Sequence, residues 1–105
     1  MLLDVGKRNL PHETVERIIH LNRPRLRACY AAGARRNPSL AGRVALHVVI
    51  DRAGTGASVT IDPSSTLDDA AVRSCLIDAF ARLSFPQPEG GVVGVDYPMI
   101  FTPEP

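Results

Sequence analysis

The longest amphipathic pattern of the chain covers residues 11–36, where hydrophobic positions recur every three or four residues, as in a helix that packs on one face. Pro24 lies inside this stretch, and a proline there removes a backbone donor and clashes with the preceding turn. We therefore expect the helix to kink or divide near residues 20–23. Asn37 and Pro38 are then expected to end it.

Strict alternation of hydrophobic and other residues follows, which predicts strands. The first strand is expected over residues 43–51 and a shorter second one over residues 57–61, with turn glycines Gly54 and Gly56 between them. This arrangement predicts an antiparallel hairpin. A third strand is expected over residues 92–101, where alternate side chains share one face.

A second helix is expected between the hairpin and the third strand. Thr66 and Asp69 have the spacing of a capping box, so we expect the helix to begin there. Its hydrophobic stripe suits packing on a sheet and consists of Val72, Cys75, Leu76, Ala79, Phe80 and Leu83.

The order helix, strand, strand, helix, strand predicts an α+β fold, in which two helices lie on one face of a three-stranded antiparallel sheet. Pro98 falls inside the third strand and has no amide hydrogen, so at least part of that strand should be a sheet edge. We expect one domain over residues 11–105, preceded by a tether or added leading segment over residues 1–10.

The net charge is +1, which gives little attraction to nucleic acid. Residues 1–50 nevertheless hold nine Lys or Arg against three Asp or Glu, so the first helical region is locally basic, and Arg35 and Arg36 are its candidate surface for an acidic partner. A solvated helix face is the simpler interpretation.

Catalytic and metal-binding patterns are missing from the sequence. The histidines have no short spacing to other metal ligands, the serines lie outside nucleophile motifs, and a lone Gly-x-Gly does not form a phosphate loop. We expect no enzymatic activity, no metal and no cofactor. No hydrophobic run reaches the length of a membrane span, and no signal peptide is visible.

Cys29 and Cys75 both fall on helical stripes that should be buried. They suit either a disulfide in an oxidising compartment or two small buried residues in a reducing one, and composition does not decide between these.

A series of short motifs runs along the chain. In order, they are Leu26 to Tyr30 (LRACY), Asn37 to Val44 (NPSLAGRV), Ile50 to Gly54 (IDRAG), Ser64 to Leu67 (SSTL), Val72 to Cys75 (VRSC), Phe85 to Gly91 (FPQPEGG) and Tyr97-Pro98. The series resembles the AgmX/PglI C-terminal domain of myxobacterial envelope proteins, a TonB-like domain. The resemblance covers nearly everything from Val15 to Phe101.

The resemblance implies a TonB C-terminal-like fold in the periplasm, as the C-terminal domain of an inner-membrane-anchored protein whose missing N-terminal regions engage a proton-driven motor. It also implies an outer-membrane or periplasmic protein partner and a role in energy transduction or gliding motility. An oxidising compartment favours a disulfide between Cys29 and Cys75. The sequence departs from the family at Thr55 and Gly56, which lengthen a turn, and at Ala31 and Ala32, where charged residues are common.

We expect the last strand to bind an extended peptide as an added strand. The residues expected to bind the partner are Val92, Val93, Gly94, Val95, Asp96 and Tyr97. Three alternatives stay open: an edge that pairs with nothing, an edge covered by residues 1–10, and a homodimer across it. A different class of function is a static scaffold that binds peptidoglycan or another protein through Arg35 and Arg36.

Overall fold

A computed structural model of the chain describes residues 12–88 and 91–103. The expected tether over residues 1–10 and the start of the first helix at Pro11 lie outside the described residues.

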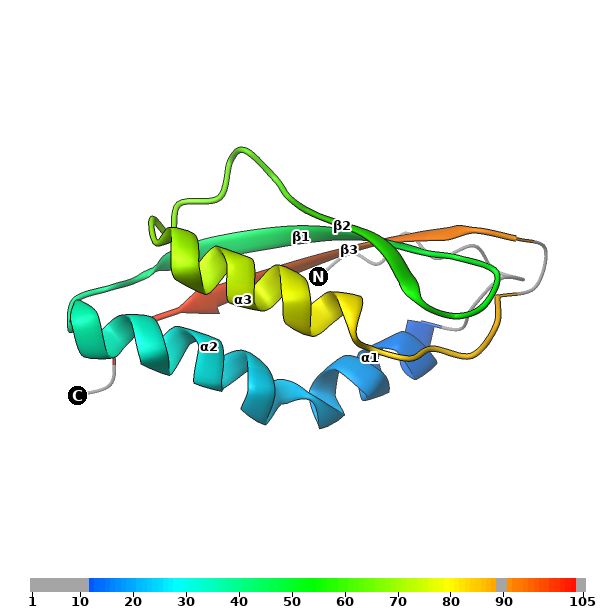
Figure 1. The fold of residues 1–105 in the computed structure, drawn as a ribbon, viewed down its shortest axis with the longest axis horizontal. Helices are drawn as coiled ribbons and strands as arrows, with labels where there is room; N and C mark the ends of the chain where they lie inside the picture. The colour runs from blue at the N-terminus through cyan, green and yellow to red at the C-terminus, as the bar shows by residue number, and fades with distance from the viewer. Residues whose placement is uncertain (1–11, 89–90, 104–105) are drawn as a thin grey trace.

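The described residues form an α+β fold with three helices and a three-stranded antiparallel sheet, and the helices lie on one face of the sheet (Figure 1). In chain order the elements are α1 (His12–Leu21), α2 (Arg23–Arg36), β1 (Gly42–Ile50), β2 (Gly56–Ile61), α3 (Ala70–Ala81) and β3 (Val93–Phe101).

The first predicted helix is divided at Asn22, inside the interval where Pro24 was expected to break it. Pro24 occupies the first turn of α2, where its missing N–H would have had no partner within the helix. The Asn22 side chain donates a hydrogen bond of 2.8 Å to the Ile18 carbonyl and so stabilises the end of α1. The described part of the chain therefore has three helices where the pattern predicted two.

β1 lies in the centre of the sheet, with β2 on one side and β3 on the other. Both pairings are antiparallel, and β1 and β3 match residue for residue from the Gly42 and Phe101 pair to the Ile50 and Val93 pair. The expected edge position of the strand that contains Pro98 is thus confirmed. Tyr97, Met99 and Phe101 face the helices, as the alternation predicted.

The hydrophobic core lies between this sheet and the helices. Its largest fully buried side chains come from α1, α3, β1 and β3 and from the loop before α3: Val15, Ile19, Val44, Leu46, Val48, Ile50, Leu67, Val72, Leu76, Phe80 and Val95. Burial of this apolar area is the main stabilising term for a domain of this size.

The capping box predicted at Thr66 is wrong, because α3 begins four residues later and is capped by Asp69. The Asp69 carboxylate accepts a 2.9 Å hydrogen bond from the Val72 amide. The Thr66 hydroxyl instead accepts a hydrogen bond of 2.8 Å from the Arg43 amide, in the central strand. Thr66 therefore satisfies a strand donor and is not available to cap a helix.

A disulfide between Cys29 and Cys75 joins α2 to α3, with a Cα–Cα distance of 5.6 Å. Cys29 is buried, but Cys75 is exposed, so the expectation that both lie on buried stripes is wrong for Cys75. The sheet-facing stripe of α3 passes through Val72 and Leu76, and Cys75 lies beside it, toward α2.

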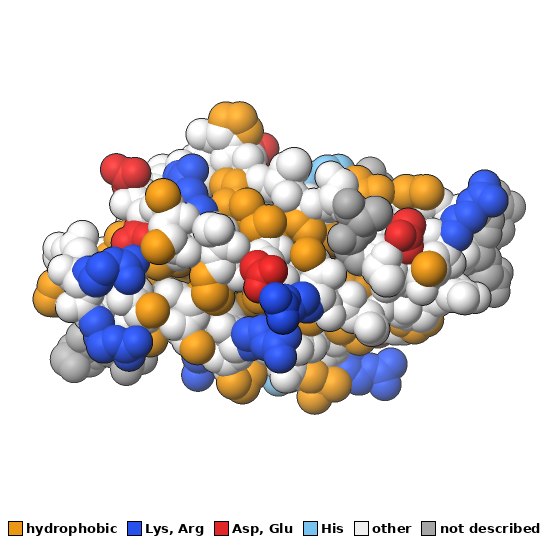
Figure 2. Space-filling view, in the orientation of Figure 1, with side chains coloured by type: hydrophobic (Ala, Val, Ile, Leu, Met, Phe, Trp, Pro, Cys, Tyr) orange, Lys and Arg blue, Asp and Glu red, His pale blue; other side chains and the backbone are white. Residues whose placement is uncertain are grey.

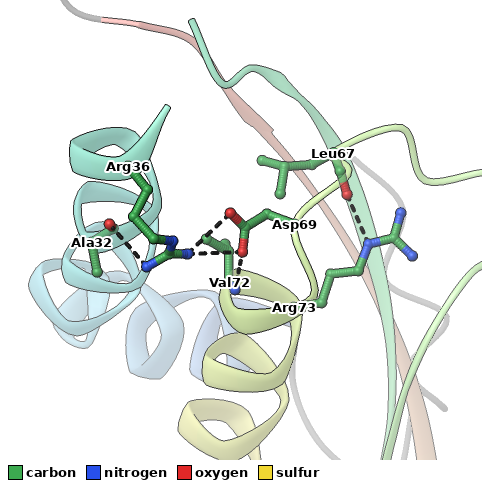
Figure 3. Close-up of polar contacts among 6 residues, drawn as sticks. All are labelled: Ala32, Arg36, Leu67, Asp69, Val72 and Arg73. Atoms are coloured by element: carbon green, nitrogen blue, oxygen red, sulfur yellow. Dashed lines mark hydrogen bonds and ion pairs between the residues drawn. The ribbon is translucent and has the colours of Figure 1, made fainter. Parts of the chain in front are cut away.

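Two further features close this α2–α3 seam. Gly33 lies where a Cβ atom would overlap Val72 Cγ2 and come within 2.8 Å of Leu40 Cδ2, so the absence of a side chain permits the close approach. Arg36 donates hydrogen bonds of 3.0 Å to both oxygens of Asp69 and one of 3.2 Å to the Ala32 carbonyl (Figure 3). The carboxylate that caps α3 thereby also binds the end of α2.

Candidate functional site

The hydrogen bonds of the central strand β1 determine which backbone groups of β3 point away from the sheet. The Ala45 carbonyl accepts a 2.8 Å hydrogen bond from Asp62, and its amide donates to Ser65 Oγ, so both groups point toward the β2 side. In an antiparallel pair, directly opposite residues either bond to each other or both point away. Pro98, opposite Ala45, therefore directs its backbone away from β1.

The same alternation applies to the rest of β3. Gly94, Asp96 and Ile100 direct an N–H and a C=O to the outer edge, with which no described strand pairs, whereas Pro98 contributes only a C=O. The absence of an amide hydrogen at Pro98 therefore costs no hydrogen bond between β3 and β1. This edge presents three donors and four acceptors to a strand that could pair with it.

The six residues predicted to bind a partner have different positions along this edge. Gly94 and Asp96 present backbone groups outward, but Val93 and Val95 are buried and, like Tyr97, direct theirs toward β1. Val92 precedes the strand and has a side chain that is 58% exposed. Ile100, which the sequence interpretation left out, belongs with Gly94 and Asp96.

Two hollows follow one another along the second half of β3, between this strand and α2. The first, of about 260 Å³, is lined by residues that include Arg23, Leu26 and Met99. The second, of about 670 Å³, extends past Tyr30 to Pro103. Both hollows share Arg27, Ile100 and Phe101, so they form one continuous surface, here called the α2–β3 groove.

The floor of the α2–β3 groove is aromatic. The rings of Tyr30 and Phe101 stack with centroids 5.0 Å apart and an angle of 13° between their planes. The Tyr30 hydroxyl donates a 2.6 Å hydrogen bond to the Leu40 carbonyl, which fixes the ring. The end of β3 is thus held beside the end of α2, where the two elements converge in Figure 1.

The charged side chains that line the α2–β3 groove are all basic. They are Arg23, Arg27 and Arg35, each exposed, and no acidic residue is among the described residues that line it. Several Lys or Arg side chains lie over α2 in the lower part of Figure 2. Of the predicted basic pair, Arg35 lines the groove, whereas Arg36 is bound to Asp69 in the seam.

Tyr97 lies at the Arg23 end of the groove and is half-buried. Burial raises the pKa of its hydroxyl, the nearby Glu16 carboxylate raises it further, and the charge of Arg23 opposes both. Tyr97 is therefore neutral at physiological pH and can donate a hydrogen bond. One buried oxygen of Glu16, Oε1, has no partner among the described residues.

The opposite face of the sheet, which no described helix covers, carries a separate hollow of about 610 Å³ lined by both acidic and basic residues. Its lining includes a contact between His47 Nδ1 and Asp96 Oδ1, 2.5 Å apart. Arg43 and Asp62 line the same hollow. Because Arg43 stands against two carboxylates, this hollow is not basic in the way that the α2–β3 groove is.

Within residues 12–88 and 91–103, no three His, Cys, Asp or Glu side chains gather closely enough to hold a metal ion. The helices in the same part of the chain are also too short or too polar to cross a membrane.

Comparisons with protein-family models, with curated proteins and with solved structures match this chain to none of them.

Proposed function

We propose that this chain is a protein-binding domain of a bacterial envelope protein, and that it binds an extended segment of its partner along the free edge of β3. The observation that carries the proposal is the outer edge of β3, with which no described strand pairs. β3 is nine residues long, and Gly94, Asp96 and Ile100 each direct both their N–H and their C=O away from β1. A bound segment would extend the sheet by a fourth strand through main-chain hydrogen bonds.

The setting in the cell rests on the motif series and on the disulfide. The motifs from Leu26 to Pro98 resemble the AgmX/PglI C-terminal domain, so we assign the chain a TonB-like role in the periplasm, in energy transduction or gliding motility. A disulfide between Cys29 and Cys75 is compatible with an oxidising compartment. The partner would then be an outer-membrane or periplasmic protein.

The alternative of a static scaffold depends on a basic surface formed by Arg35 and Arg36. Because Arg36 makes two hydrogen bonds to Asp69, its charge is largely compensated, and this surface loses one of its two cations. Strand addition at β3 therefore has the better structural support.

A test should remove one outward amide without disturbing the β1 ladder. Val95 is unsuitable because it is 1% exposed and directs its amide to β1, so a proline there would damage the core. Asp96→Pro removes an outward N–H, in the same alternation as the native Pro98. Asp96→Ala is the matched control, since both variants lose the contact with His47 and only the proline loses the amide.

The measurement is affinity capture from envelope extracts with the folded wild type and both variants, followed by identification of the captured protein. We expect wild type and Asp96→Ala to capture the same envelope protein and Asp96→Pro to lose it. Ile100→Pro with Ile100→Ala repeats the comparison at a side chain that is 75% exposed. Equal capture by both proline variants would rule out strand addition.

A further inference from the structure

We infer that the segment bound at the β3 edge is acidic, with carboxylates alternating along one face, and that Arg23, Arg27 and Arg35 of the α2–β3 groove select it. This inference rests on the proposed strand addition, because it specifies the chemistry of the segment that binds there. The two differ in the part of the site that acts: strand addition depends on the backbone of β3, whereas the selection of an acidic segment depends on side chains of α2.

The three arginines lie where side chains of an added strand would point. An added strand next to β3 would lie over the groove, and every second side chain would point to the face of the sheet that carries α2. The groove already places Arg27 beside Ile100 and Phe101 of β3. Side chains of the added strand on this face would therefore reach the guanidinium groups.

The three arginines of the groove form no ion pair with a described residue. Among the described residues, the ion pairs with lysine or arginine are those of Arg36 with Asp69 and of Arg82 with Asp78. None involves Arg23, Arg27 or Arg35. Three like charges along one wall repel each other, and carboxylates of a ligand would remove that repulsion.

The spacing of the arginines gives the pattern. Arg23 and Arg27 are separated by about 6 Å along the helix, and Arg27 and Arg35 by about 12 Å. Two residues of an extended strand span about 6.6 Å, so these intervals correspond to two and four residues. The preferred segment carries acidic residues at positions i, i+2 and i+6, with a hydrophobic residue at i+4 over Tyr30 and Ala31.

A second copy of the chain fits the same edge less well. If two copies paired their β3 strands around a twofold axis, both α2 helices would lie on the same face of the joined sheet, next to the junction. Arg23, Arg27 and Arg35 of one copy would then approach their equivalents in the other, and like charges oppose such an interface. An acidic segment has the opposite effect.

The test uses the full chain and synthetic eight-residue peptides labelled with fluorescein, with binding followed by anisotropy. The first peptide is Glu-Thr-Glu-Thr-Val-Thr-Glu-Thr, made also in the reversed order because either strand direction is feasible. Its analogues replace every Glu by Gln or by Lys. We expect the Glu peptide to bind about tenfold or more tightly than the Gln analogue, and the Lys analogue to bind least. Added salt should weaken the Glu peptide, since exposed charges are screened.

Variants separate the groove from the rest of α2. Arg27→Gln and Arg35→Gln should each weaken the Glu peptide about two- to fivefold. Arg25→Gln is the matched control, because Arg25 is an exposed arginine of the same helix that lies on the opposite flank, beside Cys75 and Asp78. It should leave the affinity within about a factor of 1.5.

The outcomes distinguish this inference from the proposal beneath it. Equal binding of the Glu and Gln peptides, equal effects of Arg25→Gln and Arg27→Gln, or no binding of the Glu peptide at millimolar concentration would overturn the inference. Strand addition would still stand if Asp96→Pro lost the envelope partner. Arginine-dependent binding that Asp96→Pro leaves intact would support the groove and contradict strand addition. A dimer in sedimentation that Ile100→Pro dissociates would assign the edge to a second copy and overturn the inference.

Discussion

The two flanks of α2 are built in opposite ways. The flank toward α3 is closed by the disulfide between Cys29 and Cys75, by the close approach at Gly33 and by the ion pair of Arg36 with Asp69. The flank toward β3 is the α2–β3 groove, where three arginines lie beside a strand edge that pairs with no described strand. One helix thus separates the two tasks: the closed flank stabilises the fold, and the open flank is available for binding.

The largest effect is expected from opening the closed flank at the disulfide. The bridge spans 46 residues of sequence, so it restricts the unfolded chain by up to about 4 kcal/mol in the chain-entropy model, with 2–4 kcal/mol typical. Replacing both cysteines by serine should lower the melting temperature by roughly 10 to 20 °C. Differential scanning calorimetry of the variant and of the reduced wild type measures this. A shift below about 3 °C would mean that the seam is held without the bridge.

The next effect is expected from exchanging glycine and alanine on the two flanks of α2. Gly33→Ala should destabilise the fold by about 1–2 kcal/mol despite the better helix propensity of alanine, because the added Cβ would overlap the buried side chains of Val72 and Leu40. On the open flank alanine should be the more stable residue: Ala31→Gly should cost about 0.5–1 kcal/mol through propensity alone. Urea denaturation of both variants gives the comparison. A stabilised Gly33→Ala protein would show that the seam is not tightly packed.

A smaller effect is expected from acid. The Val72 amide and the Arg36 guanidinium hold the pKa of Asp69 below its ordinary value, and hydrogen bonds from Thr55 and Ser64 do the same for Asp51 and Asp62. A lowered pKa in the folded state means that the ionised form stabilises the fold. That stability is complete above about pH 5 and is lost as the pH falls through the folded-state pKa values.

Asp69→Asn isolates the part of this dependence that belongs to the seam, because asparagine still caps a helix but cannot ionise. The melting temperature of the variant should fall less between pH 5 and pH 2.5 than that of the wild type, and Asp51 and Asp62 should supply the remainder. Identical pH profiles for the two proteins would exclude Asp69 from the effect.

The smallest effect on stability is expected from the open flank. Arg27→Gln and Arg35→Gln should leave the free energy of unfolding within about 0.5 kcal/mol of the wild type, since neither arginine forms an ion pair with a described residue. Chemical denaturation measures it. A loss of more than about 1 kcal/mol would give these arginines a structural role and weaken their assignment to binding.

Much of the fold could be predicted because its determinants are local. Pro24 marks the division of the first helix, the alternation over residues 43–51 and 92–101 gives two strands, and Pro98 indicates the edge. The pairing of the cysteines was expected only through the family resemblance, since helical stripes alone left a disulfide and two thiols equally open.

The rest depends on contacts between residues far apart in sequence. Thr66 matches a capping box, but its hydroxyl accepts a hydrogen bond from the amide of Arg43, 23 residues away. Arg36 and Asp69 are 33 residues apart, so no local pattern separates the role of Arg36 from that of Arg35. The residues of β3 whose backbone groups point outward can be identified only once the hydrogen-bond partners of Ala45 in β1 are known.

Residue-resolved amide hydrogen exchange, measured by NMR on the chain alone and with the acidic peptide, tests the central claim most directly. In the free chain the amides of Gly94, Asp96 and Ile100 should exchange fast, whereas those of Val95, Tyr97 and Met99 should be protected by the ladder to β1. The peptide should slow the three fast amides. Protection elsewhere with these three amides still exchanging fast would contradict binding at the β3 edge.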